Sequence, residues 1–294
     1  QSLATSGRYG CPEAEGAVRV NQVAKIEAMT GGTYFLPFAP RSADFLAITQ
    51  PAADTEWQPL PDILDGITFA ARYVGDSKAH GHWRDYLDHV HVARGKVFAT
   101  DGICLVEYDV GECPDFSILP LRVAQIKAFG SSPSYVSLDR HLALRWSNGN
   151  ILITQFRSYP KVIDEMTRVL GEHDWDGFVP MDPDWRDRII GQFSYKPAPP
   201  KAETGGTNEG FIHFAPDRIV GGPYDHKPSI QLRIVTHAQA NVTFRQTHLL
   251  RVLKIADEFK FAHGEGVSYF LFKAPKLRGV VVLNRPAEPI PVLP

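Results

Sequence analysis

The stretch from Leu87 to Val110 constrains the fold most, because apolar and polar residues alternate along it on both sides of short breaks. Strict alternation is typical of β-strands with one buried face. One break contains Gly95, and the next contains Asp101, whose side chain can bond back to the amides of a turn. The pattern predicts a β-meander in which core-facing and solvent-facing residues alternate. The predicted core residues are Val90, Val92, Val97 and Ala99, and the predicted solvent-facing residues are His89, His91 and Lys96.

Composition places the chain among ordinary globular proteins, since 44% of its 294 residues are hydrophobic and 22% are charged. No apolar run approaches the roughly 18 residues that a membrane-spanning helix needs. Cys11, Cys104 and Cys113 show no paired spacing, which favours a reducing compartment. A net charge of −2 argues against a general polyanion-coating protein, although it leaves room for a local basic surface. We therefore expect a cytoplasmic protein of two or three domains.

Helical periodicity and proline positions predict helices between the strands. A proline stands in the first turn of three predicted helices: Pro61, Pro120 and Pro183. Backbone amides in the first turn donate no hydrogen bond within the helix, so the amide hydrogen that proline lacks is not needed there. The predicted helices span residues 21–29, 59–74, 120–129, 183–192 and 247–259. Short strands are predicted around them, and residues 196–210 read as a long loop.

One order of elements occurs twice along the chain: strand, helix, strands, strand, helix, strands. Trp57 and Trp175 stand near the start of the two copies, which indicates an internal duplication. The predicted fold class is α+β, built from tandem modules. Residues 55–170 are predicted to form one module and residues 171–294 a second. Residues 1–54 are predicted to form a tail and a partial module.

Two pieces of sequence carry a further signal. The first is ARGKVFATDGICLVEY, with its Ala-Thr-Asp-Gly turn, and the second is DFSILPLRVAQIKAF, followed by strands that end in FRSYP. Together they resemble the bacterial-type DNA polymerase sliding clamp, the polymerase III β subunit family. The resemblance is good over roughly residues 57–165 and partial over residues 17–50. It implies clamp modules whose helices line a channel and whose antiparallel sheets lie outside. A divergent, phage-encoded clamp would fit the shortened N-terminal module.

The resemblance implies a processivity factor, a ring that encircles duplex DNA without reading its sequence. Bacterial clamps close as dimers and two-module clamps of other lineages as trimers, and either ring is open to this chain. Such a channel needs diffuse positive charge that faces the phosphates. Without the resemblance, basic residues on helices are ordinary solvated side chains. With it, the candidates for DNA binding are Lys25, Arg72, Arg122, Lys127, Arg186, Arg188, Arg251 and Lys254.

The resemblance also implies an apolar pocket that holds short peptides of the polymerase, the clamp loader and other partners. An apolar groove with a few polar rim groups suits a peptide anchor. The matching positions are Thr100, Gly102, Ile103, Leu105, Val281, Val282 and Leu283. Leu105 and Val282 would serve equally well as plain core residues. Family members often carry a basic residue soon after the turn, where this chain has Ile103 and Cys104, so we expect partner specificity to differ there.

Two other functions stay open at this point. A metal-dependent hydrolase would use His80, His82, His89 and His91, because paired histidines can bind zinc. A clamp-like interaction protein that forms no ring is the second alternative, since edge-strand pairing between subunits leaves no sequence signal. No nucleotide-binding or nucleophile motif occurs in its required context. We expect a protein with no enzymatic activity, no cofactor, no bound metal and no membrane partner. Its expected place is the bacterial cytoplasm or nucleoid, or the host cytoplasm for a phage protein.

Overall fold

The computed structural model describes residues 3–10, 20–27, 33–38, 54–75, 82–139, 141–194, 210–222, 230–264 and 267–284. The chain divides into two compact units, Gln1–Thr55 and Glu56–Pro294. Helices and antiparallel strands occur together, which confirms the predicted α+β class. Among the described residues, no helix combines the length and the apolar character that crossing a membrane requires. The domain borders after residues 54 and 170 stay a prediction.

The unit Gln1–Thr55 contains an antiparallel sheet in which β2 lies between its two neighbours. Its strands are β1 (Leu3–Gly10), β2 (Val20–Glu27) and β3 (Thr33–Phe38). The prediction of a helix over residues 21–29 was therefore wrong. The apolar residues Val20, Ala24 and Ile26 are spaced at even intervals, as on one face of a strand. Pairing of this segment with β1 and β3 on its two sides makes it a strand. Lys25 lies on β2, opposite Ala4 and Phe35, and belongs to no helix.

The unit Glu56–Pro294 repeats one order of elements, a strand, a helix and three strands, four times. A 3₁₀ helix, η1 (His82–Asp88), is inserted in the first repeat. The first repeat holds β4 (Gln58–Pro59), α2 (Leu64–Ala70), β5 (Val90–Ala93), β6 (Lys96–Thr100) and β7 (Cys104–Asp109). The second holds β8 (Phe116–Ile118), α4 (Pro120–Ala128), β9 (Tyr135–Ser137), β10 (Leu142–Arg145) and β11 (Ile151–Thr154).

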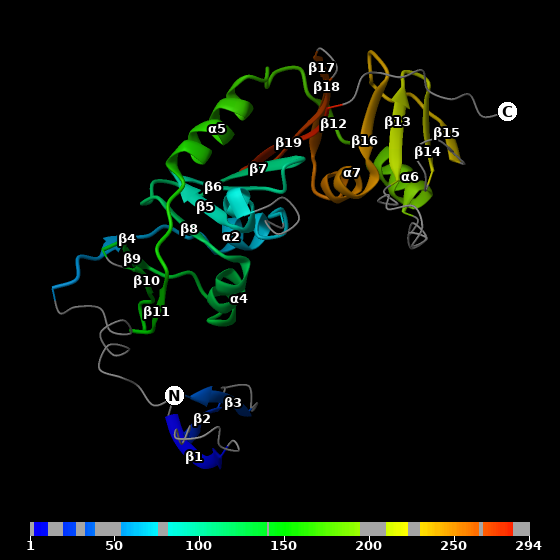
Figure 1. Cartoon of the computed structure of the whole chain (residues 1–294). Helices are drawn as coiled ribbons and strands as arrows, with labels where there is room; N and C mark the ends of the chain where they lie inside the picture. The colour runs from blue at the N-terminus through cyan, green and yellow to red at the C-terminus, as the bar shows by residue number, and fades with distance from the viewer. Residues whose placement is uncertain are drawn as a thin grey trace. The chain divides into compact units, whose positions relative to one another are not determined.

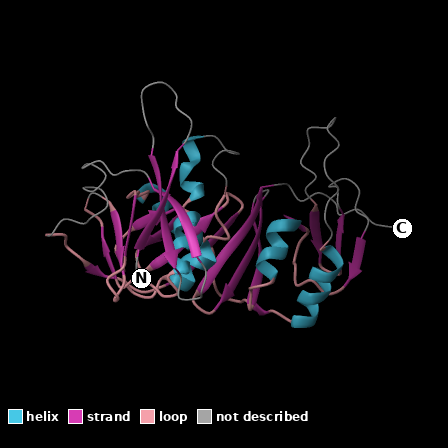
Figure 2. Ribbon diagram, turned by 90° about the horizontal axis from the view of Figure 1, so that it is seen from below, coloured by secondary structure: helices cyan, strands magenta, loops and turns pink. Residues whose placement is uncertain are grey.

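A helix that the sequence analysis missed, α5 (Pro160–Gly171), precedes the last two repeats. The third repeat holds β12 (Val179–Pro180), α6 (Pro183–Phe193), β13 (Phe211–Ala215), β14 (Arg218–Gly222) and β15 (Ile230–Arg233). The fourth holds β16 (Val242–Arg245), α7 (Gln246–Leu253), β17 (Glu258–Gly264), β18 (Val267–Ala274) and β19 (Leu277–Asn284). The helix α7 ends before residue 259, because Phe259 already belongs to β17. Figures 1 and 2 show α6 and α7 side by side.

One eight-stranded sheet joins the repeats in the order β12-β17-β18-β19-β7-β6-β5-β8. Its central ladder pairs β19 with β7, from Leu277 opposite Tyr108 to Val281 opposite Cys104. The helices α2, α4, α6 and α7 pack on one side of this sheet, and α5 lies across the other side (Figure 1). The sheet is therefore covered by helices on both faces at its centre.

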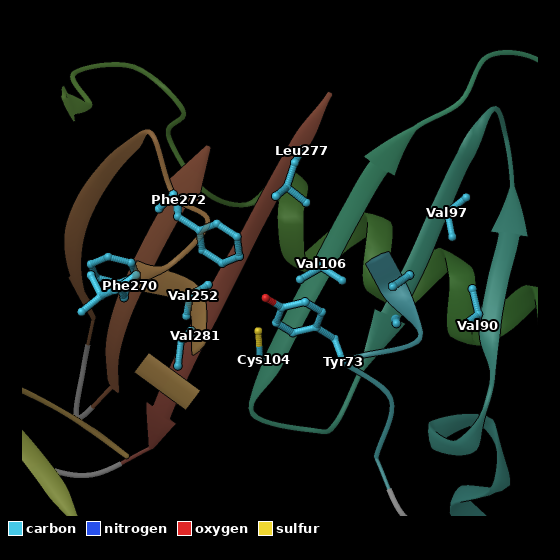
Figure 3. Packing of buried hydrophobic residues seen from close by; sticks show 14 of the residues in the cluster. Tyr73, Val90, Val97, Cys104, Val106, Val252, Phe270, Phe272, Leu277 and Val281 are labelled. Atoms are coloured by element: carbon cyan, nitrogen blue, oxygen red, sulfur yellow. The ribbon is translucent and has the colours of Figure 1, made fainter. Parts of the chain in front are cut away.

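The larger core runs without a break through the ladder between β7 and β19. Figure 3 shows Tyr73, from the segment after α2, beside Cys104 of β7, with Val252 of α7 beyond Cys104. Each of these side chains is at most 2% exposed. The first two repeats and the last two repeats thus share one hydrophobic core. Separating the two pairs of repeats would expose much of this core to water.

Candidate functional site

A cavity of about 570 Å³ lies between the outer face of the central sheet and α5. Its walls are mostly apolar, and one end is formed by the turn between β6 and β7. Five of the seven residues predicted for a partner pocket line it: Thr100, Gly102, Ile103, Leu105 and Val282. Five of the predicted residues thus line one cavity. That partner peptides bind in this cavity stays a prediction.

The turn at this end of the cavity is built by Asp101, as its sequence suggests. The Oδ1 atom of Asp101 accepts hydrogen bonds from the amides of Ile103 at 3.0 Å and Cys104 at 2.7 Å. Gly102 has a φ of 87°, a left-handed conformation that favours glycine. Thr100 accepts a further bond from the amide of Gly102 at 3.0 Å. The rim is therefore preorganised by local hydrogen bonds.

Val281, predicted for the partner pocket, does not line this cavity. Successive residues of a strand point to opposite faces, so Val281 faces the main core, where it is fully buried. The neighbours Val280 and Val282 face the cavity, and Val280 stands opposite Leu105 in the ladder. The sequence analysis missed Val280, which alternation along the strand from Val282 would have found. The side chain of Leu283 lies outside the described residues.

The opposite wall of the cavity belongs to α5. Met166 is buried against Leu105 and Val280, and Val162 and Val169 also line the space. Arg168 forms ion pairs with Glu165 and with Glu172 at the rim. The arrangement can hold an apolar segment of chain while charged side chains contact its polar flanks.

His173 closes one end of the rim. Its ring packs edge-on against Tyr269, with 4.7 Å between the ring centres. Burial lowers the pKa of His173, and the charge of Glu172 opposes that shift. A neutral imidazole beside a tyrosine ring extends the apolar wall.

Seven of the eight predicted DNA-binding residues fall into three groups, and Arg251 is described separately below. Arg72, Lys127, Arg188 and Lys254 are exposed on the side of the sheet that carries α2, α4, α6 and α7. Arg122 is half-buried and donates to Gln125 at 2.8 Å, and Arg186 pairs with Asp187 at 3.2 Å. Lys25 lies on β2 in the separate unit Gln1–Thr55.

Arg251 has a structural role that the sequence does not reveal. Its guanidinium lies over the ring of Tyr73 at 4.4 Å and donates to the carbonyl of Arg72 at 3.1 Å and to the carboxylate of Asp101. The residue therefore ties α7 to the segment after α2 and to the rim turn. It is a poor candidate for a freely exchanging phosphate contact.

His89 and His91 are buried, so their predicted solvent exposure was wrong. The Nε2 atom of His91 donates to the carbonyl of Tyr86 at 3.0 Å, and its Nδ1 atom accepts from Ser117 at 2.9 Å. Burial lowers the pKa of His91 to about 4, which keeps the ring neutral. Both nitrogens are thus occupied by protein partners. His80 and the side chain of His82 lie outside the described residues, and the described part holds no group of three potential metal ligands.

Comparisons with known proteins identify the fold. No family model matches the sequence, and no curated protein matches it either. Among solved structures, the sliding clamp of Pseudomonas aeruginosa has a TM-score of 0.56 and 13% identity, covering 89% of this chain and 76% of that one. The Helicobacter pylori β clamp, solved with a DNA ligase peptide, has a TM-score of 0.57 and 11% identity, covering 91% and 76%. The Caulobacter crescentus clamp has a TM-score of 0.56 and 14% identity, covering 89% and 76%. The chain has the fold of bacterial DNA polymerase sliding clamps.

Proposed function

We propose that this protein is a DNA sliding clamp, a ring-forming processivity factor that encircles duplex DNA and tethers a polymerase and other partners. The observation that carries the proposal is the division of the central sheet into two working faces. One face holds the helices with exposed Arg72, Lys127, Arg188 and Lys254, and the other holds the cavity under α5. A clamp needs both surfaces, one for phosphates and one for partner peptides.

A clamp-like protein that forms no ring is the alternative, and retention on DNA distinguishes the two. A closed ring stays on circular duplex DNA through gel filtration and slides off after the DNA is cut once. A protein that only binds the duplex surface is lost equally from both forms, and that result would contradict the proposed function. A metal-dependent hydrolase is not favoured, because both ring nitrogens of His91 have protein partners.

Charge reversal on the helical face should weaken the interaction with DNA. We expect the triple variant Lys127→Glu, Arg188→Glu, Lys254→Glu to bind duplex DNA at least about tenfold more weakly at moderate salt, with a shallower dependence on salt concentration. All three side chains are exposed, so the urea unfolding midpoint should not change. Fluorescence anisotropy over a salt series measures both quantities.

The matched control carries the same change in net charge elsewhere: Arg94→Glu, Lys161→Glu, Lys276→Glu. These exposed residues lie in turns and on α5, away from the helical face. Equal losses of DNA affinity in the two triple variants would show a general effect of net charge. They would contradict the assignment of DNA binding to the helical face. Arg251 is left unchanged in both, because its ion pair with Asp101 belongs to the fold.

A partner peptide should lose affinity when the floor of the cavity becomes polar. Val282 is partly exposed on the outer face of β19, so Val282→Ser removes apolar contact there with little cost to the core. We expect about a tenfold rise in the Kd of a fluorescent clamp-binding peptide, or about 1.4 kcal/mol. The control Val235→Ser makes the same change at an exposed valine outside the cavity. An unchanged Kd in Val282→Ser would place the peptide elsewhere.

A further inference from the structure

The strand β19 leads the chain directly to the rim of the cavity under α5. Val280 and Val282 line the cavity, and the amide of Val282 donates to the carbonyl of Ile103 in the rim turn at 2.8 Å. The strand ends two residues later, at Asn284. Residues 285–294, which we call the proline-rich segment, follow it and lie outside the described residues. The proline-rich segment therefore starts beside the cavity.

The sequence of the proline-rich segment is Arg-Pro-Ala-Glu-Pro-Ile-Pro-Val-Leu-Pro. Its closely spaced prolines exclude a helix, because each one lacks an amide hydrogen and clashes with the preceding turn. Proline-rich chains prefer the extended polyproline II conformation, which has three residues per turn. Ile290 and Leu293 are one such turn apart, so in that conformation they project from the same side. A segment that is already extended has little conformational freedom to lose on binding.

The walls of the cavity suit such a segment. Proline-rich chains bind in grooves that are lined by aromatic side chains. The cavity is lined by the rings of Tyr86, His173 and Tyr269, and α5 adds the aliphatic side chains of Val162 and Val169. Two apolar side chains on one side of an extended chain can therefore be buried here together.

The proline-rich segment is also long enough to reach the whole cavity. The helix α5 has 12 residues, which corresponds to a wall of about 18 Å. Residues 285–294 span about 31 Å in the polyproline II conformation. They can leave β19, reverse direction and still run along α5. Attachment beside the rim gives the segment an effective concentration of roughly millimolar order at the cavity, so modest contacts suffice for occupancy.

We propose that the proline-rich segment occupies the cavity of its own chain, with Ile290 and Leu293 against the apolar wall, and that a partner peptide must displace it. The contact is autoinhibitory. It deepens the proposed clamp function by regulating the partner site, and it rests on that function only for the identity of the displaced partner. If the segment fills the cavity about four-fifths of the time, the apparent Kd of a competing peptide rises about fivefold.

The test uses the full chain and a fluorescein-labelled synthetic peptide with the sequence of residues 285–294 as the probe. The double variant Ile290→Ser, Leu293→Ser removes both apolar side chains from the attached segment. We expect the probe to bind this variant about fivefold more tightly than the wild type, because the cavity is then open. Fluorescence anisotropy measures both affinities. Equal affinities, or no binding of the probe to the double variant, would overturn the proposal.

The matched control is the full chain with Arg285→Ser and Glu288→Ser. It also introduces two serines, it leaves the net charge unchanged, and its two positions share another side of the polyproline II turn. We expect the probe to bind this control as weakly as it binds the wild type. A gain as large as that of Ile290→Ser, Leu293→Ser would show that any change in the segment has this effect, and it would contradict the proposal.

A third change tests where the probe binds. Val169 is partly exposed on α5 and lines the cavity, so Val169→Ser removes apolar contact at little cost to the core. In the background Ile290→Ser, Leu293→Ser, we expect Val169→Ser to raise the Kd of the probe about tenfold. Val235→Ser in the same background is the control, since this exposed valine lies outside the cavity. An unchanged Kd with Val169→Ser would place the probe elsewhere and overturn the proposal.

Dilution distinguishes a contact within one chain from a contact between copies. Occupancy by the attached segment does not depend on protein concentration, so the fivefold difference between the wild type and Ile290→Ser, Leu293→Ser should persist on dilution. A difference that disappears on dilution would mean that the segment fills the cavity of another copy, which would overturn the proposal. Val282→Ser weakens both occupants of the cavity, so its effect on a partner peptide is largest in the Ile290→Ser, Leu293→Ser background.

The outcomes separate this contact from the proposed function. A fivefold gain for the probe in a protein that fails to stay on circular DNA would support the autoinhibitory contact and contradict the clamp function. Retention on circular DNA, with the probe bound equally by the wild type and the double variant, would support the clamp function and overturn the autoinhibitory contact.

Discussion

Replacement of Asp101 by Asn is expected to lower the free energy of unfolding by about 3 kcal/mol, because a buried ion pair loses one partner. The Oδ2 atom of Asp101 accepts from Arg251 and lies 3.3 Å from Nε2 of His248. The Asp101 side chain is 11% exposed and that of Arg251 is 32% exposed. An amide group would turn its own hydrogens toward both neighbours. Urea unfolding monitored by tryptophan fluorescence measures the loss.

The same substitution should change how stability depends on pH. Burial would raise the pKa of Asp101, but hydrogen bonds from His248, the Cys104 amide and Arg251 outweigh it and hold the pKa at about 2. The folded value lies below the unfolded one, so this stabilisation is complete above about pH 4 and disappears as the pH falls toward 2. The contribution is about 2 kcal/mol. The stability difference between the wild type and Asp101→Asn should therefore shrink below about pH 4.

Asp109→Asn is a close control for this prediction. Asp109 also accepts a turn amide, from Gly111 at 3.1 Å, but its side chain is exposed. We expect a loss below about 1 kcal/mol. If Asp101→Asn behaved like Asp109→Asn, the rim turn and α7 would not be coupled through this carboxylate.

The parts of the fold that the sequence predicted correctly depend on local patterns. The meander of β5, β6 and β7 follows from alternation, and its first turn has positive φ at Arg94 and Gly95. The rim turn follows from Asp101 and Gly102, and α4 and α6 follow from their first-turn prolines. In each case the deciding interaction lies within a few residues along the chain.

The errors have two causes, a distant segment that decides burial and a local signal that was overlooked. His91 alternates with the core residues Val90 and Val92, which predicted that it faces solvent. Ser117 and the carbonyl of Tyr86 cover that second face of β5, so the His91 side chain is buried. Val281 was predicted for the partner pocket together with its neighbour Val282, although a shift of one residue along a strand reverses the face. The helix α5 did carry a signal, Pro160 followed by Ile163, Met166 and Leu170 at helical spacing, and it was overlooked.

The two candidate binding surfaces also divide into residues placed by local sequence and residues placed by distant contacts. Thr100, Gly102, Ile103 and Leu105 line the cavity because they belong to one turn and the start of one strand. The pairing of Arg251 with Asp101 joins residues far apart in sequence, so helix position alone could not separate this arginine from exposed Lys254. A basic residue on the correct helix face is thus a candidate for DNA contact only if no acidic side chain from another repeat pairs with it.

Glu107 gives the second large expected effect, since it joins three strands at the ladder between β7 and β19. Its side chain is 5% exposed, it pairs with Lys96 of β6, and it accepts from Arg278 of β19 at 2.8 and 3.1 Å. Arg278 also lies over the ring of Trp175 at 5.0 Å. Glu107→Ala leaves two cations without their shared acceptor, so we expect a loss of about 3 kcal/mol in urea unfolding.

The contrast with an exposed ion pair tests whether burial causes that loss. Arg94 pairs with Asp164 of α5, but their side chains are 50% and 61% exposed, so Asp164→Ala should cost less than about 1 kcal/mol. Glu107→Leu combined with Arg278→Leu removes both charges and should recover part of the stability lost in Glu107→Ala. If all three variants unfolded at the same urea concentration as the wild type, the two halves of the sheet would be held together by their shared core alone.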